Sequence, residues 1–193
     1  MRFKTILIIA AIAAVVFWAV GSYNSLVKMD EGVESAWAQV ENVYQRRADL
    51  IPNLVSTVKG YAAHESETLE GVIAARSKAT QITVDPQNLS PEALQKFQAA
   101  QGELGSALGK LLAITENYPD LKANQNFLEL QSQLEGTENR ITVERQKFNE
   151  TAKQYNTIIR QFPKNIFAGI FGFEKKPYFE AKEGSDIAPV VEF

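Results

Sequence analysis

Apolar residues form one unbroken run and three helical stripes along the 193-residue chain. The run covers residues 6–20 and follows Arg2 and Lys4. As a helix, the stretch from Phe3 to Tyr23 would be about 31 Å long, close to the thickness of a bilayer's hydrocarbon core. The pattern therefore predicts a transmembrane anchor over residues 1–23. Its lipid-facing side chains are expected to be Ile6, Leu7, Ile8, Ile9, Ile12, Val15, Val16, Phe17, Trp18 and Val20.

A cleaved signal peptide is the alternative interpretation of the same run. The run is within the length of a signal-peptide core, and Ala19-Val20-Gly21 has the small-x-small pattern that a signal peptidase accepts. Cleavage after Gly21 would release a secreted soluble helical protein that begins at Ser22.

The charges that flank the run predict its orientation. Arg2 and Lys4 precede it, whereas Lys28 is outnumbered by Asp30, Glu31 and Glu34 on the other side. The positive-inside rule then leaves the N-terminus in the cytoplasm and exports everything after residue 23. The expected location is the inner (cytoplasmic) membrane, with the remaining domain on its extracytoplasmic side.

The first stripe predicts a long helix after the anchor. Trp37, Tyr44, Ile51 and Val58 recur at spacing seven, and only Arg47 interrupts the apolar companion positions. Pro52 lies within the stripe without shifting its phase. We expect the helix to end within residues 60–65, with Gly60 in the left-handed conformation. A break at residues 49–52 is the alternative.

Two further stripes predict the rest of the helical domain. One begins at Ser90-Pro91, a cap followed by a first-turn proline, and stops near Tyr118-Pro119. The other is expected to be a helix over residues 122–162, ended by Pro163. Its stripe consists of Phe127, Leu134, Ile141, Phe148, Tyr155 and Phe162.

These elements predict an all-α fold: a transmembrane helix followed by an antiparallel four-helix bundle over residues 24–163. Residues 164–193 would form an apolar segment and a tail. If the first and last long helices are antiparallel partners, three core pairs follow from their spacing. These are Trp37 with Phe148, Tyr44 with Ile141, and Ile51 with Leu134.

The composition excludes several kinds of catalytic and metal-binding site. The chain has no cysteine, a single histidine (His64) and a net charge of −3. Disulfides, thiolate metal sites and cysteine nucleophiles are therefore excluded, no cofactor or metal site is expected, and no basic face predicts nucleic-acid binding. A hydrolase would need a nucleophile–base pair or paired carboxylates in a pocket. We expect a protein that is not an enzyme, with a hydrolase as the alternative.

Several polar or small residues occupy positions of interest. Arg47 and Glu144 fall on core seams, so we expect them to be partly buried, hydrogen-bonded and important for helix register rather than for binding. Gly102, Gly105 and Gly109 would lower helix propensity unless a second helix, from this chain or from another copy, approaches closely. The apolar residues 166–173 are too few to span a bilayer. They could dock on the bundle or lie in the membrane interface.

Longer motifs resemble the LemA family. They include residues 45–55 (QRRADLIPNLV), 57–61 (TVKGY), 121–124 (LKAN) and 134–141 (LEGTENRI), with Tyr155-Asn156 and Tyr178-Phe179. The resemblance covers the whole chain. It implies a bacterial-type membrane protein with one N-terminal helix, a four-helix-bundle domain and no established catalytic residues. Relatives in magnetosome membranes suggest membrane organisation as a theme. Some family members are described with an external N-terminus, so both orientations stay open.

The C-terminus suggests a partner. Val191 and Phe193 end the chain in the apolar-x-apolar pattern that PDZ domains bind by strand addition. We therefore expect a non-enzymatic scaffold or adaptor of the cell envelope, acting in membrane organisation or in envelope protein quality control. Its partners would be the lipid bilayer, other copies of the chain or other membrane proteins, and a PDZ-type domain. The alternative for the terminus is an unstructured tail without a partner.

Overall fold

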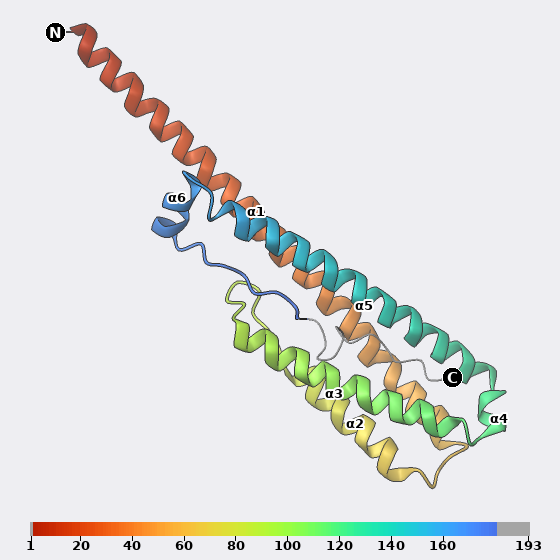
Figure 1. Ribbon diagram of the computed structural model, residues 1–193. Coiled ribbons are helices and arrows are strands. Elements are labelled where there is room, and N and C mark those ends of the chain that lie inside the picture. The colour runs from red at the N-terminus through yellow and green to blue at the C-terminus, as the bar shows by residue number, and fades with distance from the viewer. Residues whose placement is uncertain (1, 181–193) are drawn as a thin grey trace, which may run out of the picture.

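The regular structure is helical throughout residues 2–180, the part of the chain described by the computed structural model. The all-helical prediction is confirmed for this part. Figure 1 shows a long helix that extends well beyond the rest of the molecule at its N-terminal end. The helices are α1 (Arg2–Lys59), α2 (Ser66–Gln81), α3 (Pro91–Thr115), α4 (Pro119–Lys122), α5 (Gln125–Ile158) and α6 (Lys164–Phe171).

Helix α1 runs without interruption from the apolar run into the core. Its 58 residues correspond to about 87 Å. Pro52 lies inside it, so the alternative break at residues 49–52 is wrong. The chain turns instead at residues 60–65, where Ala62 is buried and donates its N–H to the Val58 carbonyl. Gly60 does not adopt the expected left-handed conformation, because this turn closes through hydrogen bonds back to α1.

Side-chain caps fix the starts of α3 and α5. Ser90 Oγ accepts a hydrogen bond from the Ala93 N–H at 3.1 Å, and Pro91 occupies the first turn, as predicted. At α5, Asn124 Oδ1 accepts from the Phe127 N–H at 3.0 Å. This cap starts α5 at Gln125 rather than at residue 122, because the preceding residues form the separate short helix α4.

The C-terminal end of α5 also differs from the expected helix. The helix stops at Ile158, and a turn follows before α6. Phe162, the last residue of the predicted stripe, lies in this turn and is largely exposed. A heptad stripe places a side chain in the core only while the helix continues, and here the helix ends one turn too early.

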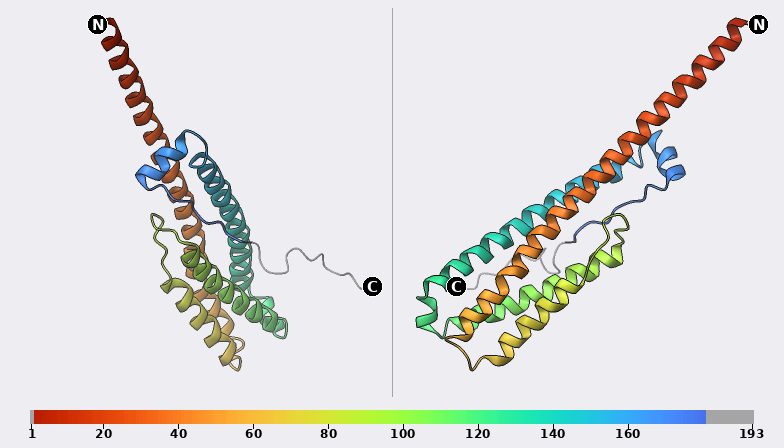
Figure 2. Two further views of the ribbon diagram at one scale, coloured as in Figure 1. Left: turned by 60° about the vertical axis from the view of Figure 1, so that its left-hand side comes forward. Right: turned by 180° about the vertical axis from the view of Figure 1, so that it is seen from behind.

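The helices form a long pair and a short pair. Helices α1 and α5 run antiparallel and pack along each other, whereas α2 and α3 form an antiparallel hairpin beside the C-terminal half of α1 (Figures 1 and 2). Helix α6 leaves the direction of α5 and lies next to α1, close to where its exposed N-terminal part begins.

The first core cluster is built around aromatic rings. Trp37 contacts Phe97 of α3 and Phe148 of α5, with ring centroids 5.3 and 5.6 Å apart. Tyr44 also contacts Phe97, at 5.0 Å. Tyr44 and Ile141 belong to this same cluster. The expected pair Trp37–Phe148 therefore lies in direct ring contact across the α1–α5 seam.

The second core cluster lies toward the α1–α2 turn and joins all four long helices. It contains the third expected pair, Ile51 and Leu134. Its other fully buried large side chains are Leu54, Val58, Val72, Leu104, Leu111, Leu121 and Phe127.

Arg47 lies on α1 between the two clusters, one turn from Tyr44 and one from Ile51. Its Nη1 is 2.8 Å from Glu138 Oε1 of α5, and its Nη2 donates to the Gln101 carbonyl of α3 at 3.1 Å. Gln101 Nε2 in turn donates to the Ala79 carbonyl of α2 at 3.4 Å. The network therefore connects α1, α2, α3 and α5 through one guanidinium group, and Arg47 is buried and hydrogen-bonded as expected.

The Arg47–Glu138 pair should couple more strongly than a surface pair of the same length. Arg47 is 4% exposed and Glu138 49%, whereas Lys78 and Glu103, 2.7 Å apart across α2 and α3, are 58% and 52% exposed. In double-mutant cycles to alanine, we expect a coupling free energy of about 1.5 kcal/mol for Arg47–Glu138, because a charge-assisted bond to a buried cation is little screened by water. We expect about 0.5 kcal/mol for Lys78–Glu103.

Urea unfolding of the full chain in detergent micelles, followed by far-UV circular dichroism, measures both cycles. Equal coupling energies for the two pairs would show that Arg47 does not organise the helices.

Candidate functional site

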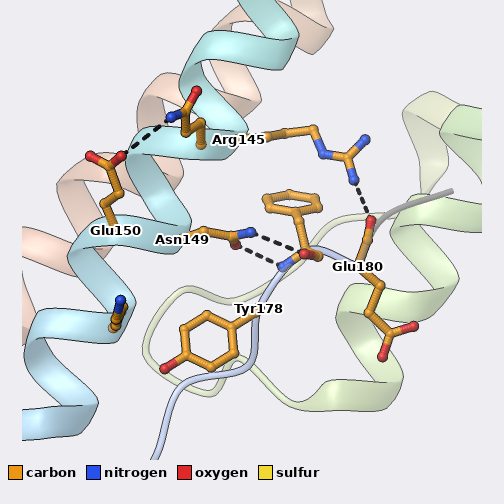
Figure 3. Close-up of a pocket in the computed structure, with 8 residues that line it drawn as sticks. Arg145, Asn149, Glu150, Tyr178 and Glu180 are labelled. Carbon is orange, nitrogen blue, oxygen red and sulfur yellow. Dashed lines mark hydrogen bonds between the residues drawn. The ribbon is translucent and has the colours of Figure 1, made fainter. Parts of the chain in front are cut away.

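Residues 174–180 form an extended segment that lies on the helices beyond α6. Together with α5 it borders an open groove of about 500 Å³. Figure 3 shows the segment entering the groove beside α5. The groove is lined by Arg145, Gln146, Asn149, Glu150 and Lys153 of α5 and by Tyr178, Phe179 and Glu180. We call residues 174–180 the strap.

Two asparagines of α5 hold the main chain of the strap. Asn149 accepts from the Phe179 N–H at 2.8 Å and donates to the Phe179 carbonyl at 3.0 Å (Figure 3). Asn156 makes the same pair of bonds with Lys176, at 2.9 and 2.8 Å. Each carboxamide thus replaces the donor and acceptor that a neighbouring strand would offer.

The spacing of the two asparagines matches the spacing of the strap. Seven helical residues rise about 10.5 Å, and three extended residues cover about 10 Å. Asn149 and Asn156 therefore lie on one face of α5, two turns apart, and bind strap residues three positions apart. The strap runs antiparallel to α5, because the later asparagine holds the earlier strap residue.

Side chains of the strap enter the first core cluster. The Phe179 ring stacks on Trp37 with centroids 5.8 Å apart and planes inclined by 13°. The Arg145 guanidinium lies 4.7 Å from the centre of the Phe179 ring. The Glu180 carbonyl accepts from Arg145 Nη2 at 2.9 Å and from Gln98 of α3 at 3.2 Å. The strap therefore closes the space between α1, α3 and α5.

A buried lysine anchors the other end of the strap. Lys176 Nζ is 3.0 Å from Asp30 Oδ1 of α1 and 5.9 Å from the centre of the Tyr155 ring. Burial, with smaller contributions from the charges of Asp30 and Glu174, raises the pKa of the Tyr155 phenol. A phenol is neutral at physiological pH even without this shift, so the charge partner of Lys176 is the Asp30 carboxylate.

Aromatic side chains of the exposed part of α1 contact aromatic side chains in α6 and just beyond it. Trp18 contacts Phe167 with ring centroids 5.1 Å apart, and Tyr23 contacts Phe171 at 4.9 Å and Phe173 at 5.9 Å. We call these five residues the aromatic collar. The side chains predicted to face lipid are all exposed. They are Ile6, Leu7, Ile8, Ile9, Ile12, Val15, Val16, Phe17, Trp18 and Val20.

The residues singled out for other chemistry lie apart. His64 is exposed in the α1–α2 turn, and residues 2–180 contain no group of three or more His, Asp or Glu side chains that could hold a metal ion. Glu144 is mostly buried but pairs with Lys147 on its own helix at 2.7 Å, not with another helix. These placements bring no acid–base constellation together in the described part of the chain.

The glycines of α3 do not contact another helix of this chain. A Cβ atom at Gly102 or Gly109 would meet nothing within 4 Å, and one at Gly105 would lie 4.0 Å from Arg47 Nη1. Of the two alternatives for the second helix, the one from this chain is therefore wrong, and the one from another copy stays a prediction. All three glycines are exposed.

Comparison with known proteins gives the family. The model of the LemA family matches residues 36–193, which is most of the chain. The chain belongs to the LemA family. The match includes the strap and the asparagines that hold it, whereas the apolar run lies outside it.

Three relatives are similar to this chain over most of its length. Magnetosome protein MamQ 2 of Paramagnetospirillum magneticum is 28% identical, over 96% of this chain and 75% of its own length. Magnetosome protein MamQ of Magnetospirillum gryphiswaldense is 29% identical, over 88% and 68%. Protein LemA of Metamycoplasma hominis is 27% identical, over 94% and 79%.

In this LemA protein, the strap contacts were not predicted from the sequence. Asn149 and Asn156 directly follow Phe148 and Tyr155 of the third stripe, so their heptad spacing was a readable signal of a polar row beside the seam. Nothing in that row indicates an extended segment as its partner. Val191 and Phe193 lie outside the described residues.

Loss of Asn149 should release the strap without unfolding the helices. In the Asn149→Leu variant, we expect hydrogen exchange of the residue 176–180 amides to rise about tenfold, because two hydrogen bonds are lost. Exchange within α1 and α5 should stay slow. The measurement is hydrogen–deuterium exchange by mass spectrometry.

Gln146→Leu is the matched control, because Gln146 lines the same groove but donates only to Glu150 of its own helix. If both variants exchange alike in the strap, then Asn149 does not hold it.

Proposed function

We propose that the protein is a single-pass membrane protein whose antiparallel four-helix bundle serves as a non-enzymatic scaffold or adaptor at the cell envelope. The observation that carries this proposal is the continuity of α1. The same helix begins in an exposed apolar run and ends in the second core cluster. The anchor and the bundle would therefore be joined by one continuous helix.

The apolar run has the properties of a membrane span. Among the described residues, α1 is the one helix long and apolar enough to cross a bilayer, and its most apolar stretch has no buried residue. A core helix of a soluble protein would be mostly buried. An exposed apolar surface of this length needs a partner, and lipid covers such a surface on all sides.

Contacts of the collar favour an uncleaved anchor over a signal peptide. Trp18 packs on Phe167 of α6, and cleavage after Gly21 would remove this contact. The charges of Arg2 and Lys4 favour a cytoplasmic N-terminus in the inner membrane and an extracytoplasmic bundle.

A scaffold role is favoured over an enzymatic one by the groove beside the strap. Its charged groups are Arg145, Glu150, Lys153 and Glu180, which offer no nucleophile–base pair. The named magnetosome relatives make membrane organisation one process in which such a scaffold would act. Envelope protein quality control is the second process that we propose, through the C-terminus.

Labelling with a membrane-impermeant maleimide tests the orientation, since the chain contains no native cysteine. Ile73 is an exposed residue of α2, far from the anchor. We expect Ile73→Cys to react in intact spheroplasts and Phe3→Cys, which keeps the charges of Arg2 and Lys4, to react only after lysis. The reverse pattern would place the bundle in the cytoplasm. Reaction of Ile73→Cys in the medium, with a mature N-terminus at Ser22, would favour the secreted alternative.

We further propose that the terminus with Val191 and Phe193 binds a PDZ-type domain of the envelope. A second copy, or another membrane protein, would use the exposed glycines of α3. Affinity capture of detergent-solubilised full-length protein and of a variant lacking residues 190–193 tests the terminus. We expect only the full-length protein to recover a PDZ-containing partner. Recovery of the same partners by both would mean that the tail binds nothing.

A further inference from the structure

Helix α6 has one face on the protein and one face open. Ala168 is buried, and Phe167 and Phe173 pack against the first core cluster. Ile166 and Ile170, four residues apart and so on the same face, are 50% and 69% exposed. Phe162, in the turn before α6, is also exposed. The open apolar face of this docked helix is therefore not covered by the described part of the chain.

The ends of α6 are fixed by the fold. Lys164 Nζ is 3.1 Å from Ser25 Oγ of α1, which holds the first turn against the bundle. At the other end, Gly172 has a left-handed backbone (φ 75°), and the Phe173 N–H donates to the Ala168 carbonyl at 2.9 Å. This is the glycine-dependent arrangement that ends many helices. The open face of α6 is therefore held in a defined direction.

The aromatic collar gives α6 its level along α1. Trp18 lies near the end of the apolar run and Tyr23 three residues beyond it, and both contact α6, Tyr23 also Phe173 just past its end. Figures 1 and 2 show α6 beside α1 where the protruding part of α1 begins. Tryptophan and tyrosine favour the boundary between acyl chains and headgroups. If residues 3–23 span a bilayer, then α6 lies at that boundary.

We propose that α6 is a second membrane contact, which inserts Ile166 and Ile170 into the interfacial layer of the bilayer. This proposal rests on the proposed transmembrane anchor. The occupant is lipid rather than a protein, because α6 packs on the exposed apolar part of α1 through Phe167 and Trp18, and the proposed anchor places that part in lipid.

The consequence is a fixed tilt of the bundle. A single helix crossing a bilayer leaves the attached domain free to rotate about the helix axis and to lean. A second contact beside the first would prevent the domain from rotating about this axis, because the rotation would pull α6 out of the membrane. The groove beside the strap would then keep a constant direction relative to the membrane.

Spin labels at single cysteines can measure this contact in the full-length protein. We would place the label at Ile170, at Val15 in the apolar run and at Ile73 of α2, and reconstitute each variant into nanodiscs of phosphatidylethanolamine and phosphatidylglycerol. Ile73 is the matched control, since it is an apolar helix residue with 53% exposure, compared with 69% for Ile170. Power saturation with oxygen and with a water-soluble nickel chelate then reports depth.

We expect the oxygen-to-nickel collision ratio at Ile170 to be at least threefold that at Ile73 and below that at Val15. A ratio at Ile170 equal to that at Ile73, with Val15 in lipid, would overturn the α6 contact and leave the anchor intact. A water-like ratio at Val15 would instead overturn the anchor itself.

A second copy of the chain on α6 would give a different result. Both collision rates at Ile170 would then fall together, and spin–spin broadening would appear when two labelled copies share a nanodisc. That outcome also overturns the lipid contact. Because Ile166 and Ile170 are exposed, an Ile166→Asn exchange should leave the far-UV circular dichroism unchanged and lower the ratio at Ile170 toward that at Ile73.

Discussion

The helix arrangement depends on the hydrogen bonds of the Arg47 guanidinium group. This group is almost inaccessible to water, and it bonds to Glu138 of α5 and to Gln101 of α3, which itself bonds to α2. A buried cation is costly unless its donors are paired. If α5 or α3 shifted by one turn along α1, then Glu138 or Gln101 would move away from the Arg47 guanidinium group. Apolar contacts tolerate such shifts more readily, so the bonds of the two Arg47 Nη atoms favour the observed register, although its buried Nε has no partner.

The position of Arg47 also divides the core. The ring contacts around Trp37 lie in the first cluster, whereas the second cluster is mostly aliphatic and contains Phe127 as its buried aromatic residue. The strap completes only the first cluster, through Phe179 and Lys176. The second cluster contains residues of α1 to α5 and no residue of the strap. Release of the strap would thus loosen the half of the domain that lies near the collar and leave the other half packed.

Much of this fold could be predicted from periodicity, because the core-facing residues of a long amphipathic helix recur in the sequence with the helical period. Trp37, Phe148, Ile51 and Leu134 were placed in the core on spacing alone. The caps were harder: Ser90 with Pro91 was readable, whereas Asn124 was not, since the short helix α4 precedes it. The coupling of Arg47 to Glu138, rather than a role for Glu144, depends on side-chain geometry that spacing does not contain.

The strap shows where such prediction stops. Its conformation has no local period, because Asn149 and Asn156 of α5 supply the hydrogen bonds that a strand would take from a neighbour. Only the tertiary structure brings residues 20 to 30 positions apart into this arrangement.

The same contacts change the meaning of the predicted boundary between anchor and domain at residue 23. Ser25 bonds to Lys164, Asp30 pairs with Lys176, and Trp18 packs on Phe167. These ties lie on both sides of residue 23, and α1 is unbroken through it. A flexible joint needs a loop or a kink with few contacts. The structure therefore has no flexible joint at residue 23, and the helix that carries the apolar run is packed against the helical domain from Trp18 onward.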